Sequence, residues 1–375
     1  MTVPYSPGLE GVVAAQTEIS EVDGQNGRLI YRGGYLIEEL FGRSFEEVAY
    51  LLLTGELPNP PQLDDFKAKL AARRKLNDQG RAALAGLHGD VDPMDALRTV
   101  VSAHTAAPGC PKPTLEDAIS LTAVAPAAVA AFYRHHNGDA PVEPRPDLGH
   151  AANFLYMLDG EEASADRVRW LESYLVLLAD HGLNASTFTA RVACSTGSDM
   201  ASSIVAAIAA LKGPAHGGAA TAAMNMLEQV PGPDAAEEFV IDRLDHHQRL
   251  MGFGHRVYRT YDPRARILRE LAKEGNPAFY AVAFKVEETA LRELVARHPE
   301  RPNATNVDYW SAGVLAAAGF PKEFFTSVFA VSRMVGWTAH VLEYTQKDGR
   351  IIRPASEWVG PDPGRRPDKQ TAASA

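Results

Sequence analysis

Apolar residues recur along most of this chain at steps of three and four, the spacing that gathers side chains on one face of an α-helix. Asp92-Pro93, a pair that often starts a helix, precedes one such stretch, and residues 168–178 repeat the pattern. Thr114 and Asp117 have the spacing of a capping box, so we expect a helix from there to Tyr133, interrupted at Pro126. Further helices are predicted at 198–211, 219–230, 234–248, 263–273, 277–297 and 321–346.

Strand signals are confined to the N-terminal region. Residues 12–22 and 27–32 contain β-branched residues and flank the sequence Asp-Gly-Gln-Asn at 23–26, which is typical of a hairpin turn. No repeat of solenoid length is visible, and residues 361–375, rich in Pro, Gly, Ala and charge, are expected to form a disordered tail. The pattern therefore predicts a mainly α fold with a short N-terminal β hairpin.

The composition excludes several classes of function. With 46% hydrophobic and 22% charged residues among 375, the chain has the make-up of an ordinary globular protein. The 47 acidic residues exceed the 37 Lys and Arg residues, and the formal charge of −10 disfavours a nucleic-acid partner. We see no signal-peptide pattern and no run of about 18 apolar residues, so no membrane partner is expected. Two cysteines, Cys110 and Cys194, fit a reducing, cytoplasmic setting.

His216 lies in a glycine-rich segment, Gly-Pro-Ala-His-Gly-Gly at 213–218, directly before a predicted helix. The positive end of a helix disfavours an imidazolium ion, so the ring would stay neutral and donate an N–H to a developing oxyanion or enolate. The structural alternative is that His216 satisfies loop carbonyl groups while the glycines form the turn. The residues alone leave both interpretations open.

Arginine is concentrated between residues 249 and 269, where six arginines accompany one acidic residue, Asp262. The sequence Met-Gly-Phe-Gly-His-Arg at 251–256 lies inside this stretch, but no strand precedes it and a third glycine is absent, which excludes a dinucleotide-binding loop. Clustered guanidinium groups suit phosphates and carboxylates, and glycines let backbone N–H groups approach a ligand. The alternative is a solvated arginine face.

Three further residues are candidates for chemistry. Arg264 falls in the first turn of a predicted helix, where a cation opposes the helix dipole, so we interpret it as an anion ligand. Asp308 follows a polar loop and is either a helix N-cap or a general base whose pKa is raised by apolar neighbours. Arg333 is the sole charge between 324 and 337, so it needs an internal carboxylate, a bound acidic substrate or a path to the surface.

The twelve histidines form no recognisable metal site. His135-His136 and His246-His247 are adjacent pairs, which do not face one another on a helix. His340 is interpreted as a core histidine with satisfied hydrogen bonds. The motifs of serine hydrolases, P-loop proteins and Cys-x-x-Cys redox proteins are also missing. We therefore expect neither a metal nor a cofactor.

Five sequence blocks carry a resemblance to a known family. They are HGLNAST at 181–187, GPAHGG at 213–218, MGFGHRVY at 251–258, DPR at 262–264 and NVD at 306–308. In this order and spacing they resemble the citrate synthase family, and the likeness runs from Gly8 to about Pro361. The resemblance implies a Claisen condensation of acetyl-CoA with oxaloacetate, followed by hydrolysis of the thioester to give citrate and CoA.

The resemblance also implies roles for individual residues. Asp308 removes a proton from the acyl α-carbon, His216 hydrogen-bonds the thioester oxygen, and His255 polarises and protonates the keto oxygen. The residues expected to bind oxaloacetate are His181, Arg264, Arg333 and Arg353, the last reaching across a dimer interface. The residues expected to bind CoA are Arg249, Met251, Gly252, Phe253, Gly254, Arg256 and Arg259.

The family has a large helical domain with a smaller helical domain inserted into it, and the two close on the oxo acid. Mapped onto this chain, residues 1–217 and 320–360 form the large domain and residues 218–319 the small one. A homodimer with shared active sites is implied through Arg353. The chain begins without an N-terminal extension, so the allosteric hexamer of longer relatives is not expected.

Two alternatives remain beside citrate synthase. The sequence departs from the family pattern at Ala215, at Ala304-Thr305 and by an extra glycine in Tyr-Arg-Gly-Gly at 31–34. These departures bear on the volume of the acyl pocket, so a 2-methylcitrate synthase using propionyl-CoA is the alternative within the class. The alternative of another class is a non-catalytic helical protein that binds CoA or acidic metabolites.

Overall fold

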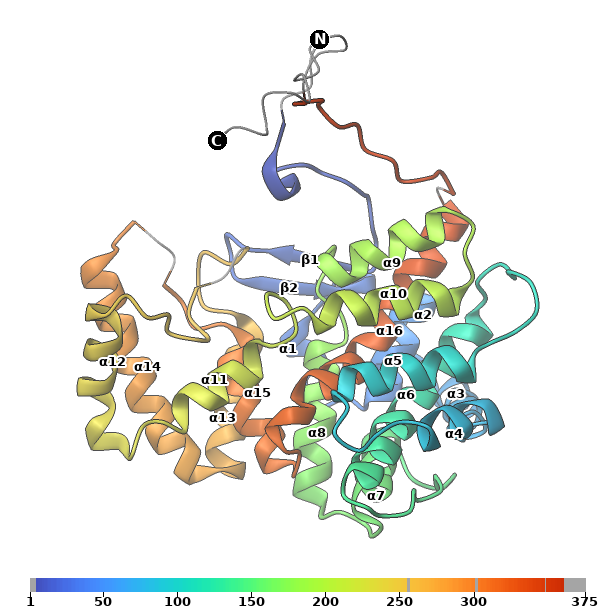
Figure 1. The fold of residues 1–375 in the computed structure, drawn as a ribbon, viewed down its shortest axis with the longest axis horizontal. Helices are drawn as coiled ribbons and strands as arrows, with labels where there is room; N and C mark the ends of the chain where they lie inside the picture. Colours follow the sequence, from blue (N-terminus) through green and yellow to red (C-terminus); the bar gives the residue numbers. More distant parts are fainter. Residues whose placement is uncertain (1–4, 255–256, 301–302, 348, 361–375) are drawn as a thin grey trace, which may run out of the picture.

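The prediction of a mainly α fold is confirmed. The computed structural model describes residues 5–254, 257–300, 303–347 and 349–360, and within them it contains sixteen α-helices and one small sheet (Figure 1). The helices are α1 (Ile37–Leu40), α2 (Phe45–Thr54), α3 (Pro60–Ala71), α4 (Asp78–Ala85), α5 (Pro93–His104), α6 (Leu115–His136), α7 (His150–Asp159), α8 (Ala165–Leu178), α9 (Ala185–Ser195), α10 (Met200–Lys212), α11 (Ala219–Leu227), α12 (Ala236–Asp245), α13 (Pro263–Gly275), α14 (Pro277–Arg297), α15 (Val307–Ala317) and α16 (Phe325–Lys347).

Local capping explains why several helices begin where the sequence predicts. α5, α13 and α14 each open on a proline, and the residue before it accepts a hydrogen bond from a backbone N–H of the first turn. Helices α1–α4, α7 and α9 escaped prediction. In α2, for example, seven of ten residues are buried, so no polar face marks the helical period.

The interruption expected at Pro126 is wrong. α6 continues through this proline, and every residue from Leu121 to Phe132 is buried against neighbours that include α16, α5 and α7. Proline removes one backbone donor, but packing along the whole helix keeps it continuous. By length and composition α6 is apolar enough to cross a membrane, although no such segment was expected from the sequence. In the structure, 78% of its most apolar window is buried inside the protein.

The predicted hairpin is present, with a first strand shorter than expected. β1 (Ser20–Asp23) pairs antiparallel with β2 (Arg28–Tyr31), and β3 (Tyr35–Leu36) adds a third, unpredicted strand. The Asp23 carboxylate closes the turn by accepting hydrogen bonds from the backbone and side chain of Asn26. The tip rests on residues 257–261: a Cβ at Gly24 would lie only 2.2 Å from the Val257 carbonyl oxygen.

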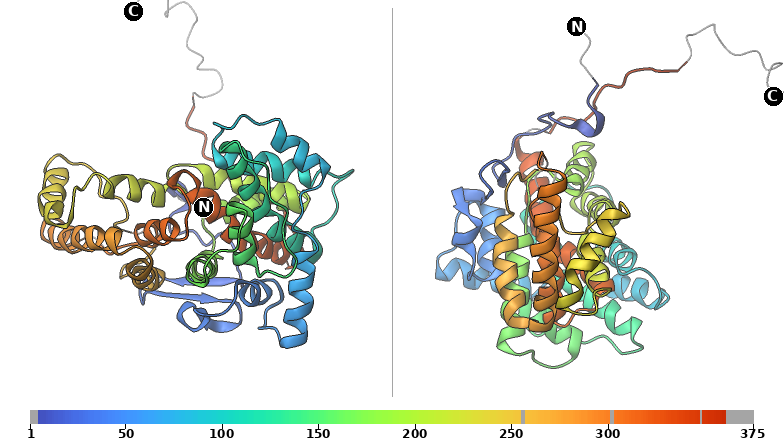
Figure 2. Two further views of the ribbon diagram at one scale, coloured as in Figure 1. Left: turned by 90° about the horizontal axis from the view of Figure 1, so that it is seen from below. Right: turned by 90° about the vertical axis from the view of Figure 1, so that its left-hand side faces the viewer.

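Helix α16 occupies the centre of the molecule. It contacts α6, α8, α9 and α10, and almost every residue from Phe325 to Tyr344 is buried. Helices α11 to α15 gather on one side of it (Figure 1), and the segments near the two termini leave the body on a common side (Figure 2). The turns that precede α9, α11, α13 and α15 hold most of the candidate site residues.

Candidate active site

His216 lies in the turn between α10 and α11 and is half-buried. Its backbone N–H bonds the Gly213 carbonyl at 2.8 Å, and Gly217 is required beside it because a Cβ there would lie 2.4 Å from the Leu211 carbonyl oxygen. The ring reaches α9, where its Nε2 lies 2.8 Å from the Ser186 hydroxyl. The contact is with this serine rather than with a loop carbonyl group, which argues against the structural alternative.

The contacts of His216 fix its tautomer. The backbone N–H of Ser186 can only donate, and it points at His216 Nε2 over 3.3 Å. Nε2 is therefore the acceptor, and the neutral ring carries its proton on Nδ1. The Ser186 hydroxyl accepts from the indole N–H of Trp337 at 3.0 Å, and because Nε2 carries no proton, the hydroxyl donates its single proton to His216. Sequence analysis missed the roles of Ser186 and Trp337, although Ser186 stands within the HGLNAST block.

Electrostatics keep the His216 imidazole neutral. Burial lowers the pKa of His216 to about 4, and the positive charge of Arg333 acts in the same direction. The ring is thus uncharged throughout the neutral range and has one N–H to donate, as expected of an electrophilic histidine.

Asp308 is the second residue of α15, so its interpretation as an N-cap is wrong. The cap is Asn306, whose side-chain oxygen accepts from the Asp308 backbone N–H at 3.1 Å. Because Asn306 satisfies the helix end, the Asp308 carboxyl is not needed there. Burial raises its pKa to about 6, the charge of Asp262 adds to that rise, and Arg264 and Arg333 oppose it. A carboxylate of this kind is a stronger base than an exposed aspartate.

The glycine-containing segment predicted to bind CoA is joined to the start of α15. Phe253 forms a β-bridge with Thr305, the Gly254 N–H bonds the Ala304 carbonyl, and the Asn306 N–H bonds the Gly252 carbonyl. Gly252 has φ +88°, and a Cβ on it would lie 2.6 Å from the Tyr309 ring. This segment and the loop carrying Asp308 therefore form one unit, and only glycine fits where they meet.

Arg264 is buried at the start of α13, and its partner is the helix N-cap. Its guanidinium group donates to both oxygens of Asp262, over 3.1 and 2.8 Å. Although burial opposes it, the Asp262 charge raises the pKa of Arg264, which stays a cation. Two of the five guanidinium N–H donors are used in this pair. The side chain is therefore held rigidly before any ligand arrives.

Arg333 is buried in the middle of α16 with 1% of its surface exposed, so it does not reach the solvent. Its Nε donates to the Leu178 carbonyl over 2.8 Å, and its guanidinium carbon lies 4.8 Å from the centre of the Phe329 ring. Among the described residues, no carboxylate forms an ion pair with it. Burial lowers the pKa of Arg333, and the Asp180 charge counteracts this. A cation so placed favours an anionic ligand.

His181 lies in the turn before α9 and is partly buried. Its Nε2 is 3.4 Å from the hydroxyl of Tyr258, which lies next to Arg259, one of the predicted CoA-binding residues. The turn continues into Asn184, the N-cap of α9, whose side-chain oxygen accepts from the Thr187 N–H at 3.1 Å. His181 thus brings α9 and the 257–261 segment together.

The remaining predicted site arginines are exposed or, with His255, lie outside the described residues. His255 and Arg256 belong to the latter group. Arg249, Arg259 and Arg353 are exposed. Two arginines of the arginine-rich stretch already have acidic partners, since Arg264 pairs with Asp262 and Arg269 with Glu287. Sequence proximity could not show the second of these pairs, which joins α13 to α14.

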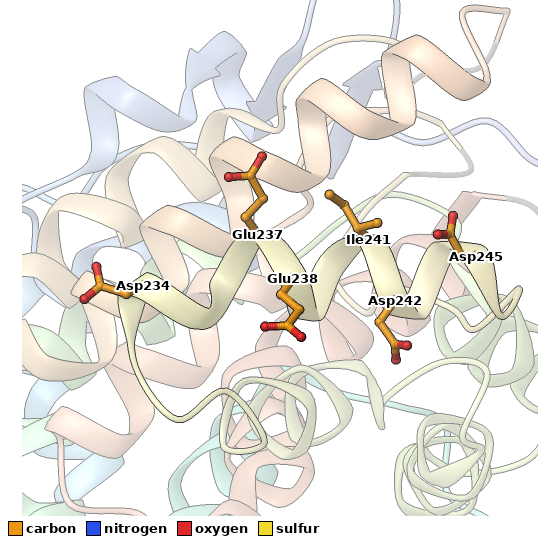
Figure 3. A pocket seen from close by; sticks show the side chains of 6 residues that line it. All are labelled: Asp234, Glu237, Glu238, Ile241, Asp242 and Asp245. Atoms are coloured by element: carbon orange, nitrogen blue, oxygen red, sulfur yellow. The ribbon is translucent and has the colours of Figure 1, made fainter.

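A surface hollow on α12 is unsuited to the substrates expected here. It is lined by Asp234, Glu237, Glu238, Ile241, Asp242 and Asp245, with side chains on both sides of the helix (Figure 3). Five carboxylates would repel a dicarboxylate or a CoA phosphate. Two of them already meet cations, since Glu237 pairs with Arg292 and Asp245 with Arg297.

Comparisons with known proteins identify relatives of this chain. Residues 8–355 match the family described as "Citrate synthase, C-terminal domain". A citrate synthase from Haloferax volcanii is 43% identical over 94% of this chain and 95% of its own, and a 2-methylcitrate synthase from Shewanella oneidensis is 35% identical over 95% of each. The structure resembles a citrate synthase from Thermoplasma acidophilum, solved in ternary complex with carboxymethyl coenzyme A and oxaloacetate, with a TM-score of 0.90, 35% identity, and coverage of 96% and 97% of the two chains. The chain belongs to the citrate synthase family.

Proposed function

We propose that this protein condenses acetyl-CoA with oxaloacetate and hydrolyses the resulting thioester, giving citrate and CoA. The observation that carries the proposal is that burial shifts the pKa values of two candidate catalytic groups in opposite directions. Burial raises the pKa of Asp308 to about 6 and lowers that of His216 to about 4. At neutral pH the carboxylate is then ionised and the imidazole neutral, which are the states that a base and an electrophile need.

The proposed chemistry begins at the methyl group of acetyl-CoA. Asp308 takes an α-proton while the Nδ1–H of His216 donates to the thioester oxygen, so charge develops on an oxygen that is already hydrogen-bonded. The enol or enolate carbon then attacks the keto carbon of oxaloacetate. By resemblance to the family, His255 protonates the keto oxygen as it becomes a hydroxyl. Water finally cleaves the thioester, and the reaction needs only its two substrates and water.

The proposed binding sites use the charges already described. Arg264 and Arg333, with His181, bind the two carboxylates and the keto group of oxaloacetate, because guanidinium groups match carboxylates in geometry and charge. The CoA chain lies along the Gly252–Gly254 backbone, with Arg249, Arg256 and Arg259 facing its phosphates and Met251 and Phe253 beside it. The fixed contacts of this segment with Thr305 and Asn306 support its placement next to Asp308.

We also propose that residues 218–319 form a small domain that closes on residues 1–217 and 320–360. The grouping of α11 to α15 on one side of α16 supports this division (Figure 1). Closure would bring Asp308 and the CoA-binding segment onto His216 and exclude water from the carbanion step. The two cysteines, one exposed and one buried and neither in a disulfide, are consistent with the proposed cytoplasmic location.

The assay that tests the function is release of free thiol from acyl-CoA in the presence of oxaloacetate. We expect acetyl-CoA to be used with a kcat/KM about tenfold or more above that of propionyl-CoA, because one methylene in a fitted pocket has an effect of that order. A preference for propionyl-CoA would assign the chain as a 2-methylcitrate synthase. A pure, folded protein that binds CoA but releases no thiol with either substrate would support the non-catalytic alternative.

A homodimer with shared active sites is the proposed assembly. Arg353 lies in an extended segment after α16, and that segment exposes large apolar side chains: Ile351 is 62% exposed, Trp358 76% and Val359 90%. The segment near the N-terminus lies on the same side of the molecule (Figure 2). In that segment Val13 is 87% exposed. Apolar arms of this kind usually have a protein partner, and a second copy would place Arg353 in its neighbour's oxaloacetate site.

This sharing of sites predicts complementation between two inactive variants. Arg353→Gln and Asp308→Asn chains, each nearly inactive alone, are expected to regain thiol release when co-expressed as a heterodimer. One site of that heterodimer then carries both lesions and the other carries neither. If Arg353 served its own subunit, both sites would carry one lesion and the heterodimer would stay inactive. Analytical ultracentrifugation checks that each variant and the mixture are dimers.

A further inference from the structure

A chain of buried polar groups runs through the large helical core and ends beside His181. Arg191 of α9 forms an ion pair with Glu343 of α16 and donates to His340 Nδ1 at 3.0 Å. His340 Nε2 lies 3.3 Å from Asp180 Oδ2. The four side chains lie within the protein: His340 and Asp180 have no exposed surface, and the other two are nearly covered.

The direction of each hydrogen bond in this chain is determined. Arg191 is always protonated and can only donate, so His340 Nδ1 accepts and Nε2 carries the proton. His340 therefore donates to Asp180 Oδ2. The same oxygen accepts the Ser20 hydroxyl and, over 3.1 Å, the Gly182 backbone N–H. Burial alone would raise the pKa of Asp180, but His340, Arg333 and Ser20 outweigh it, so the pKa is lowered and the group is a carboxylate.

The backbone on both sides of His181 is held by these contacts. On one side, the Asp180 N–H donates to the Tyr31 hydroxyl at 3.1 Å. On the other, the Gly182 N–H meets the Ser20 hydroxyl at 2.8 Å as well as Asp180. Ser20 lies on β1 and Tyr31 is its partner on β2, so the N-terminal hairpin holds the turn. His181 itself takes no part in these bonds to the hairpin.

Close packing against α16 leaves this turn no alternative position. A Cβ on Gly336 would lie 2.3 Å from the Ala179 carbonyl oxygen and 2.4 Å from Asp180 Oδ1. That Oδ1 atom is buried and has no hydrogen-bond partner within the part of the chain that the structure describes. The negative charge of Asp180 acts instead on Arg333, which lies one turn before Gly336 on α16, and it favours the protonated guanidinium group. The carboxylate thus adjoins two of the proposed oxaloacetate ligands.

We propose that Asp180, with Ser20 and His340, is a positioning residue for the oxo-acid site: it locks the turn that presents His181 and places a fixed negative charge behind Arg333. The inference rests on the proposed function, in which His181 and Arg333 bind oxaloacetate. None of the three positioning residues touches the substrate. The hairpin is then part of the substrate site, although no hairpin residue reaches the ligand.

Ser20→Ala tests the proposal with the smallest change. The variant loses the hydroxyl that joins Asp180 to the Gly182 N–H, and we expect the Kd for oxaloacetate, measured by isothermal titration calorimetry without acyl-CoA, to rise about 3–10-fold. At saturating oxaloacetate, kcat and the KM for acetyl-CoA are expected to stay within about twofold, because the bonds that hold His216 and Asp308 are untouched.

Ser203→Ala is the matched control. Ser203 is likewise a buried serine whose hydroxyl donates a hydrogen bond, here to the Asp199 carbonyl group at 2.9 Å, but it lies in α10 and not in the turn. Both variants should lose similar thermal stability, and only Ser20→Ala should lose oxaloacetate affinity. An unchanged Kd in Ser20→Ala, or an equal rise in the control, would overturn the proposal.

Asp180→Asn and Ser20→Thr extend the test. The asparagine keeps one oxygen for the three donors and removes the charge, so its oxaloacetate Kd should rise more than that of Ser20→Ala; no rise would refute the role of Asp180. The threonine retains the hydroxyl and should restore wild-type affinity. If wild-type protein released no thiol, the proposed function would fail; if it were active while these affinities did not change, only the positioning role would fail.

Discussion

Asp308→Asn is expected to lower kcat by about 10²–10⁴-fold, the usual contribution of a positioned general base. The amide cannot accept the α-proton of acetyl-CoA, while the side-chain volume and the cap formed by Asn306 remain. Oxaloacetate affinity should change little, because that substrate is bound by other residues. Thiol release under saturating substrates and oxaloacetate titration measure the two quantities on the same preparation. A variant with wild-type turnover would remove Asp308 from the mechanism.

The raised pKa of Asp308 gives this prediction a pH profile. Because the base must be ionised, wild-type kcat should rise with pH through the range around 6 and level off above it. The residual activity of Asp308→Asn should lack this step. A wild-type rate that did not change between pH 5 and pH 7.5 would contradict the assignment.

The same substitution should stabilise the protein at neutral pH. A carboxyl group whose pKa is higher in the folded than in the unfolded state stabilises the fold as long as it is protonated. The folded state therefore loses stability as the pH rises from about 4 to about 6. Above that range the ionised Asp308 costs about 1–3 kcal/mol of unfolding free energy. Asp308→Asn removes this cost, so its unfolding midpoint in urea should exceed that of the wild type at pH 8 and approach it at pH 4.

His216→Ala is expected to lower kcat by about 10²–10³-fold, the effect of removing one donor from a developing oxyanion. The KM for oxaloacetate should change much less. Because the pKa of His216 is about 4, its protonation should not limit the rate above pH 5, and the profile near pH 6 should persist in the variant. Retention of more than a tenth of the wild-type kcat would argue against the electrophilic role.

Ser186→Ala tests how much the exact position of the His216 imidazole, and not only its presence, contributes to the rate. The ring would keep the Ser186 backbone N–H but lose the hydroxyl, which Trp337 holds in place. We expect a kcat reduction of about tenfold or less, well below that of His216→Ala, because the hydroxyl contributes a single hydrogen bond. A larger loss in Ser186→Ala than in His216→Ala would contradict a positioning role for the serine.

Features that depend on neighbours along the chain could be predicted from the amino-acid sequence. Helix starts at Pro93, Pro263 and Pro277 and the hairpin turn after Asp23 could be read from the residues because their hydrogen bonds join positions two or three apart. The five motif blocks indicated the family for the same reason, because each block is a contiguous stretch of the sequence. The mainly α architecture followed from the hydrophobic period.

Which charged residues are isolated and which are paired became clear from the packing of the folded chain. Asp308 could be a cap or a base until Asn306 was seen to hold the helix end, and Arg333 could reach solvent until α16 was seen at the centre of the core. The bonds from Ser186 to Trp337 and from Ser20 to Asp180 join residues 151 and 160 positions apart. Burial and partners of this kind set pKa values and side-chain positions, and they arise from packing between distant segments, which no local pattern records.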